Sequence, residues 1–146
     1  MRLSEALRDK PHRVVDLPPS ATAIEAAALM KKERVGAIVV RDYQGRLLGL
    51  VSERDLALAI ATHGNALFRI RLGELMSTHP PTASPHDAVR DVTRIMTDQR
   101  ARHLPVVDGE RVVGLISIGD LLKARLAEKT EENAVLLDLT RARIPT

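Results

Sequence analysis

Residues 49–56 read Gly-Leu-Val-Ser-Glu-Arg-Asp-Leu, and residues 114–121 read Gly-Leu-Ile-Ser-Ile-Gly-Asp-Leu. Five of the eight positions are identical, and the two segments are 65 residues apart. Upstream, Leu29-Met30 is matched by Ile95-Met96 at an offset of 66 residues. The one-residue difference falls in a polar, glycine-containing stretch, where folded repeats tolerate a change of length. The chain therefore contains one structural unit twice.

Each copy shows the same order of expected elements. Apolar residues at helical spacing predict a first helix, and two short apolar runs joined by a glycine-containing turn predict a hairpin. A second helix is expected to begin near Ser52 in the first copy and near Ser117 in the second. The extended stretch, helix and two strands are expected at 14–17, 20–34, 37–40 and 47–51 in the first copy, and at 81–83, 84–100, 104–107 and 112–116 in the second.

One such unit is too short to bury both faces of its hairpin, so the two are expected to pack sheet against sheet about a pseudo-two-fold axis. The sequence predicts an α+β fold of two βαββα repeats with a flanking N-terminal segment and a C-terminal helix. Two clefts are expected where strand ends meet helix starts, a setting that favours phosphates. The predicted boundaries are 1–60 for the first repeat with the N-terminal segment, 61–73 for a linker, 74–125 for the second repeat and 126–146 for a helical tail.

The composition argues against two classes of partner. The formal net charge is +3 and the pI is about 9.7, but the basic residues are scattered among 19 acidic ones, and only Tyr43 and Phe68 are aromatic. Because proteins that bind single strands stack bases on aromatic side chains, no nucleic acid is expected as a partner. No apolar run is long enough to span a bilayer, and residues 1–10 lack an apolar signal core, so no membrane contact and a cytoplasmic location are expected.

Motifs that carry chemistry are missing as well. The chain has no cysteine, and its five histidines lack the spacing of a helical zinc pair, so no metal site is expected. No nucleophile elbow, Walker-type loop or dinucleotide-binding glycine motif occurs. Glu53 and Asp55 are two residues apart at a helix start and point apart, which is poor geometry for an acid–base pair. The sequence therefore predicts no catalytic residue and no enzymatic activity.

The two repeats closely resemble the cystathionine-β-synthase (CBS) domain family. The resemblance covers about residues 14–122. Two copies of Gly-x-x-Ser-x-x-Asp, each preceded by the expected helix and hairpin, make the resemblance specific, and the chain looks like the stand-alone bacterial type with one repeat pair. The matching segments are 26–30, 35–40 and 49–55 in the first copy, and 75–77, 102–108 and 114–120 in the second.

The resemblance implies a ligand site in each cleft. In the family, the aspartate of the Ser-x-x-Asp element binds ribose hydroxyls, a role that carries over to Asp55 and Asp120. A carboxylate suits this role because it accepts charge-assisted hydrogen bonds from both vicinal hydroxyls. The other matching positions are Ser52 and Ser117 for ribose or phosphate, Arg102 and His103 for phosphate, and Ile38, Leu104, Pro105, Val15 and Thr82 for adenine.

The two clefts are not expected to be equal. The first repeat has Gly36-Ala37 where the second has Arg102-His103, so the first repeat lacks these basic side chains. Arg54, beside Asp55, is the residue that could compensate. We therefore expect one cleft to bind more tightly, with Arg102 and His103 making the stronger phosphate contact.

A purely structural explanation stands beside this one. Ser52 and Ser117 are at positions where a serine caps a helix, and an acid three residues later completes a capping box without any ligand. Arg102 and His103 could equally form a solvated strand edge. Gly49 and Gly114 are expected to be bends that let two backbones approach.

The leading hypothesis is a regulatory sensor that binds an adenine nucleotide (AMP, ADP or ATP, with NAD as a further candidate) and needs no cofactor. The alternative is a structural dimerisation or interaction module whose clefts are vestigial or bind S-adenosylmethionine. The resemblance also implies a homodimer, and the apolar faces at 26–30 and 92–96 are its candidate surface unless they form the core of the monomer. An unidentified regulated protein is expected to respond to the bound ligand.

Overall fold

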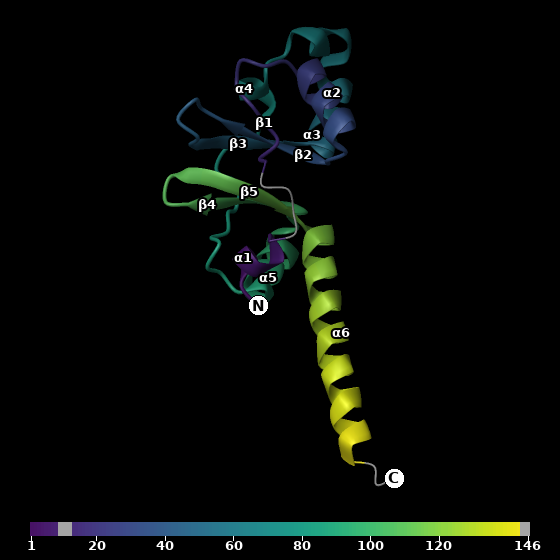
Figure 1. Ribbon diagram of the computed structural model, residues 1–146. Helices are drawn as coiled ribbons and strands as arrows, with labels where there is room; N and C mark the ends of the chain where they lie inside the picture. Colours follow the sequence, from purple (N-terminus) through teal and green to yellow (C-terminus); the bar gives the residue numbers. More distant parts are fainter. Residues whose placement is uncertain (9–12, 144–146) are drawn as a thin grey trace.

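The computed structural model describes residues 1–8 and 13–143. Two hairpins lie side by side in the middle of the molecule, helices lie on either side of them, and a long C-terminal helix extends away (Figure 1). The sequence correctly predicted this α+β architecture of two repeats. The first hairpin consists of β2 (Ala37–Arg41) and β3 (Leu47–Ser52), and the second consists of β4 (His103–Asp108) and β5 (Arg111–Ser117).

The helices follow the predicted order. The stretch predicted as a linker, 61–73, carries the end of α3, a 3₁₀ turn and the first half of a short helix. The predicted tail is continuous with α6, and residues 144–146 lie outside the described residues. The first repeat contains β1 (Asp16–Leu17), α2 (Ala23–Glu33) and α3 (Glu53–His63), the second contains α5 (Val89–Gln99) and α6 (Ile118–Arg143), and the short elements are α1 (Leu3–Ala6), η1 (Gly64–Arg69) and α4 (Leu72–Leu75).

The two repeats contact each other through the turn ends of their hairpins. The N–H of Val112 donates to the carbonyl of Gly45 at 3.0 Å, and the guanidinium of Arg41 donates to the carbonyl of Val112 at 3.1 Å. The same guanidinium forms an ion pair with Asp16 at 2.6 Å. Arg41 therefore links the first strand of its own repeat to the hairpin of the other.

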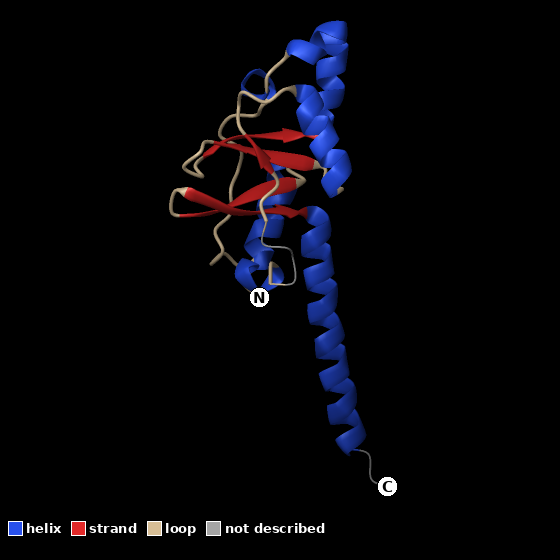
Figure 2. Cartoon of the chain, turned by 45° about the horizontal axis from the view of Figure 1, so that its top comes forward, coloured by secondary structure: helices blue, strands red, loops and turns tan. Residues whose placement is uncertain are grey.

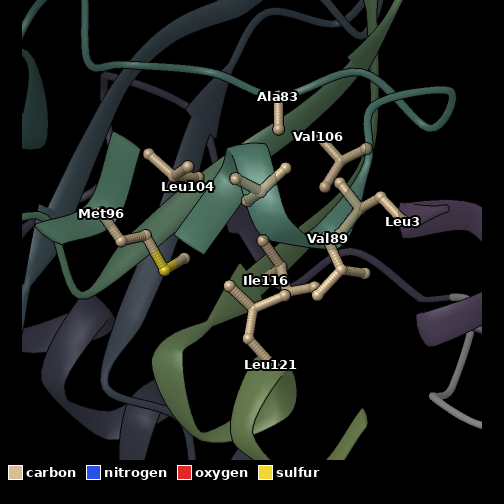
Figure 3. Packing of buried hydrophobic residues seen from close by; sticks show 9 residues of the cluster. Leu3, Ala83, Val89, Met96, Leu104, Val106, Ile116 and Leu121 are labelled. Atoms are coloured by element: carbon tan, nitrogen blue, oxygen red, sulfur yellow. The ribbon is translucent and has the colours of Figure 1, made fainter. Parts of the chain in front are cut away.

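Each repeat has its own apolar core. The first core lies between its hairpin and the helices α2 and α4, and the second lies between its hairpin and the helices α1, α5 and α6, as Figure 3 shows for the second core. The buried residues are Ala21, Ala26, Met30, Ile38, Val40, Val51 and Leu72 in the first core, and Leu3, Ala83, Val89, Val92, Met96, Leu104, Val106, Ile116 and Leu121 in the second.

The short helices α1 and α4 are exchanged between the repeats. Leu3, at the start of the chain, is fully buried in the core of the second repeat (Figure 3). Leu72, just ahead of the second repeat, is fully buried in the core of the first. The prediction had grouped the N-terminal segment with the first repeat and opened the second repeat at residue 74. In the structure Leu3 instead packs with the second repeat and Leu72 with the first.

The faces proposed for dimerisation form the core of the monomer instead. Ala26 and Met30 of α2 pack in the first core, and Val92 and Met96 of α5 pack in the second. Each of these four side chains is buried. The stated alternative, that these faces form the core of the monomer, therefore holds for these four side chains, because they pack with the hairpin of their own repeat.

Gly49 lies where β3 is approached by the chain that follows α4. The N–H of Leu50 donates to the carbonyl of Ser77, and the N–H of Ser77 donates to the carbonyl of Leu50, at 3.1 and 2.9 Å. A Cβ on Gly49 would lie 2.6 Å from the sulfur of Met76 and 2.8 Å from the carbonyl oxygen of Ser77. This close approach confirms the interpretation of Gly49 as a site of backbone contact.

We expect Gly49→Ala to lower the free energy of unfolding by about 1–3 kcal/mol, because the methyl group must push a paired backbone away. Urea unfolding followed by far-UV circular dichroism measures the change. Gly114→Ala is the matched control at the equivalent position, where the nearest atom to the new Cβ would be 3.7 Å away. Its expected effect is neutral or stabilising by about 0.4–1 kcal/mol. Equal losses in the two variants would contradict this explanation.

Candidate functional site

The second helix of each repeat begins with the same capping arrangement. In the first repeat the N–H of Ser52 donates to Oδ2 of Asp55 at 2.8 Å, and the N–H of Asp55 donates to Oγ of Ser52 at 3.2 Å. In the second repeat, Ser117 and Asp120 repeat both bonds at 2.9 and 3.1 Å. The structural explanation of the Ser-x-x-Asp element is therefore confirmed. The bonds also fix each carboxylate at the positive end of a helix.

Strand register places the start of each hairpin next to these helix starts. Ala37 pairs with Ser52, and His103 pairs with Ser117. The residue before each strand closes the arrangement, since Gly36 accepts a hydrogen bond from the N–H of Glu53 and Arg102 accepts one from the N–H of Ile118, both at 3.0 Å. At one edge of each repeat, the serine and the aspartate therefore lie next to the residues at which the hairpin begins.

The two edges meet at Gly36 and His103. A Cβ on Gly36 would lie 3.3 Å from Cε1 of His103 and 2.5 Å from Oε1 of Glu53. The space that a side chain would need at position 36 is therefore filled by groups from both repeats. A side chain at position 36, which corresponds to Arg102 in the second repeat, would therefore require Glu53 and His103 to move.

A cavity of about 940 Å³ joins Asp120 of the second repeat to Val15 of the first. It lies between the proximal part of α6, the segment that leads into β1, the end of α2 and the helix α1. Both Asp120 and Val15 were predicted as ligand-binding residues, and the structure brings them together although they are far apart in the sequence. The lining residues are Met1, Glu5, Ala6, Arg8, Arg13, Val15, Glu33, Val35, Asp120, Lys123, Ala124, Ala127 and Glu131.

Charged side chains from several elements line this cavity. Its cations include Arg8, Arg13 and Lys123, none of which was predicted as a site residue. Arg13 forms an ion pair with Glu33 at 3.6 Å and is 73% exposed, so its guanidinium can exchange this partner for an anion. Lys123 follows Asp120 by three residues and so lies on the same side of α6. This spacing is the signal that could have identified Lys123 from the sequence.

The other residues predicted to contact adenine differ in their exposure to solvent. Ile38 and Leu104 have no exposed surface and fill the cores of their own repeats, so in this structure neither offers a side-chain surface to a ligand. Pro105 is buried, and its carbonyl accepts a hydrogen bond from the N–H of Ala83. Thr82 is exposed, one residue before the bridge between Ala83 and Val106.

The predicted basic residues lie at the start of β4 and in the first turn of α3. Arg102 and Arg54 are exposed, and His103 is half-buried beside Gly36. None of the three lines the cavity at Asp120. Within the part of the chain that the structure describes, no three histidine, cysteine or acidic side chains gather closely enough to hold a metal ion. No helix in the same part of the chain is both long and apolar enough to cross a bilayer.

Comparison with known proteins shows to which family this pair of repeats, each with a Ser-x-x-Asp element, belongs. The CBS domain model matches residues 11–62 and again residues 72–127. The chain belongs to the CBS-domain family. CBS domain-containing protein YhcV of Bacillus subtilis is 33% identical over 123 residues, which cover 84% of this chain and 86% of YhcV. The mitochondrial CBS protein CBSX3 of Arabidopsis thaliana is also 33% identical, but the match covers 56% of its length.

Solved CBS structures support the same fold. A CBS-domain protein of Agrobacterium tumefaciens superimposes with a TM-score of 0.81 at 34% identity, and the match covers 86% of this chain and 99% of that one. A CBS-domain protein of Pyrobaculum aerophilum, crystallised with AMP, superimposes with a TM-score of 0.73 at 32% identity and covers 82% of this chain and 89% of its own.

Proposed function

We propose that this CBS pair is a regulatory module that binds an adenine nucleotide, with AMP as the first candidate, in the cavity between Asp120 and Val15. The observation that carries the proposal is that one carboxylate at a helix start and apolar residues of the other repeat line a single cavity. Its volume of about 940 Å³ lies within the range of small-molecule sites in proteins.

Each part of a nucleotide has a suitable chemical group in this cavity. The carboxylate of Asp120 can accept hydrogen bonds from the ribose hydroxyls. Val15 and Val35, both half-buried, supply apolar surface for the base. Arg13 and Lys123 supply positive charge for a phosphate. No lining residue is required to act as a nucleophile or an acid–base catalyst, so the proposed role involves no catalysis and no further cofactor.

Binding at this place supplies a route to regulation. The cavity walls come from both repeats and from the exchanged helix α1, so a ligand contacts elements whose relative position determines the width of the cavity. A ligand changes this position only to the extent that it binds one arrangement more tightly than another. We propose that an unidentified protein, rather than a nucleic acid or a membrane, responds to this change.

Thermal unfolding and calorimetric titration test the proposal directly. AMP, ADP, ATP, NAD and S-adenosylmethionine are each added to the purified chain, and the expected result is saturable heat and a raised midpoint with AMP. At a ligand concentration of 100 times the dissociation constant, stabilisation of about 2.7 kcal/mol is expected. If no adenine compound gives heat or a shift, the structural module remains the better explanation. If S-adenosylmethionine alone binds, the choice of ligand is wrong.

A further inference from the structure

Arg41 is the last residue of β2 and lies where the turn ends of the two hairpins meet. Its Nε donates to Oδ2 of Asp16 at 2.6 Å, and its Nη1 donates to the carbonyl of Val112 at 3.1 Å. The side chains of Arg41 and Asp16 are 23% and 37% exposed. One guanidinium therefore binds β1 of the first repeat and β5 of the second at the same time.

The second repeat has no such pair at the equivalent positions. The first strands of the repeats align at an offset of 66 residues, which sets Asp16 against Thr82 and Arg41 against Val107. The second repeat forms its hairpin with these two uncharged residues, so the βαββα unit does not require the ion pair. A partly exposed ion pair also contributes little to stability. What distinguishes Arg41 is therefore its link to the other repeat.

Both contacts of Arg41 lead to walls of the cavity. Asp16 directly follows Val15, which lines the cavity. Val112 lies in β5, the strand that leads into α6 and Asp120. The two hairpin turns lie together at the left, and α6 begins at the right, about 20 Å along β5 from Val112 (Figure 2). A small rotation of one repeat against the other at the turns is therefore magnified at the start of α6.

We propose that Arg41 is a positioning residue for the cavity, because it binds both repeats and thereby fixes the separation of Val15 and Asp120. This role rests on the proposed function, since these two residues line the proposed nucleotide site. Without the link, the repeats sample other arrangements, and the apparent affinity falls with the fraction of molecules in the binding arrangement. By linkage, a bound nucleotide restores the arrangement that Arg41 maintains.

The second repeat supplies the variant that tests this role. Asp16→Thr/Arg41→Val gives the first repeat the residues found in the second and leaves neither charge of the pair behind. Arg41→Lys is the second variant, because its ammonium can still pair with Asp16 but offers one nitrogen where Arg41 uses two. Arg46→Val is the matched control, since the guanidinium of Arg46 pairs with Asp42 of its own hairpin turn at 2.9 Å.

The first measurement is the distance between the repeats, which needs no nucleotide. Lys32 and Asp98 are exposed, equivalent positions on α2 and α5, and the absence of native cysteine allows spin labels on Lys32→Cys/Asp98→Cys alone. Double electron–electron resonance is expected to give the same narrow distance distribution with Arg41 in place and in Arg46→Val. A broader distribution is expected in Asp16→Thr/Arg41→Val and in Arg41→Lys. Equal distributions in all four proteins overturn the proposal.

The second measurement is calorimetric titration with AMP. Both Arg41 variants are expected to have a dissociation constant about three to ten times higher, as when roughly a tenth to a third of the molecules are in the binding arrangement. Arg46→Val is expected to bind as the unmodified chain does, and saturating AMP is expected to narrow the broadened distributions. Unchanged AMP affinity beside a broadened distribution overturns the positioning role. If the unmodified chain binds no adenine compound, the proposed function is wrong, and the distance measurement alone decides whether Arg41 holds the repeats together.

Discussion

Asp120→Asn is expected to weaken AMP binding by about tenfold to a hundredfold, because hydrogen bonds to a charged group contribute roughly 1.5–3 kcal/mol. The amide has nearly the size of the carboxylate, and its oxygen can still accept the N–H of Ser117 at the start of α6. The capped helix therefore remains while the negative charge that faces the ribose is lost. Calorimetric titration with AMP measures the change in affinity, and far-UV circular dichroism verifies the fold.

Asp87→Asn is the matched control for this substitution. Oδ2 of Asp87 accepts the N–H of Ser84 at 2.8 Å, so the same Ser-x-x-Asp bond occurs there outside the cavity. Its AMP affinity is expected to equal that of the unmodified chain. If Asp120→Asn binds AMP as tightly as this control does, Asp120 does not hold the ribose and the proposed position of the ligand is wrong.

Leu72→Ala is expected to lower the free energy of unfolding by about 2–5 kcal/mol, the range for truncation of a fully buried leucine. Leu72 has no exposed surface, although it belongs to a helix of only four residues. Leu3→Ala is expected to cost a similar amount, because Leu3 is the corresponding buried residue in the other core. Because each core needs a helix from outside its own repeat, both variants are expected to unfold in one transition. Urea titration followed by far-UV circular dichroism measures the loss.

Leu58→Ala serves as the control for these truncations. Leu58 lies on α3 and is 55% exposed, so its replacement is expected to change stability by about 0.5 kcal/mol or less. A loss for Leu72→Ala as small as that of the control would show that α4 is not part of the first core. Two separate unfolding transitions would show that the repeats do not depend on each other.

The elements that the sequence predicted well are those formed by neighbouring residues. The helices α2 and α5 and the two hairpins follow from periodicity and glycine-containing turns, and the offset between the copies identified the repeat. The helices α1 and α4 were not predicted, because four residues with a single buried leucine give no periodic signal. A shorter repeat does mark them, since residues 2–5 and 71–74 both read Arg-Leu-x-Glu.

Of the residues that line the candidate cavity, the sequence and the resemblance predicted Asp120 and Val15 but not the cations beside them. Asp120 follows from a local capping pattern that the family shares. Lys123 could have been identified from its spacing to Asp120 on α6, but Arg13 lines the same cavity because the segment before β1 meets α6 in three dimensions, which no spacing in the sequence expresses. The apolar faces of α2 and α5 illustrate the same limit, since periodicity identifies an apolar face and does not show which element covers it.

The exchange of α1 and α4 has a consequence for the ancestry of the pair. A single ancestral unit, made before the gene was duplicated, would have carried its short helix at one end and an unfilled apolar slot at the other. Two such molecules could bury both the short helix and the apolar slot only by exchanging their leading helices. Within the present chain each repeat still depends on the helix of the other, so either half produced alone is expected to associate with a second copy of itself.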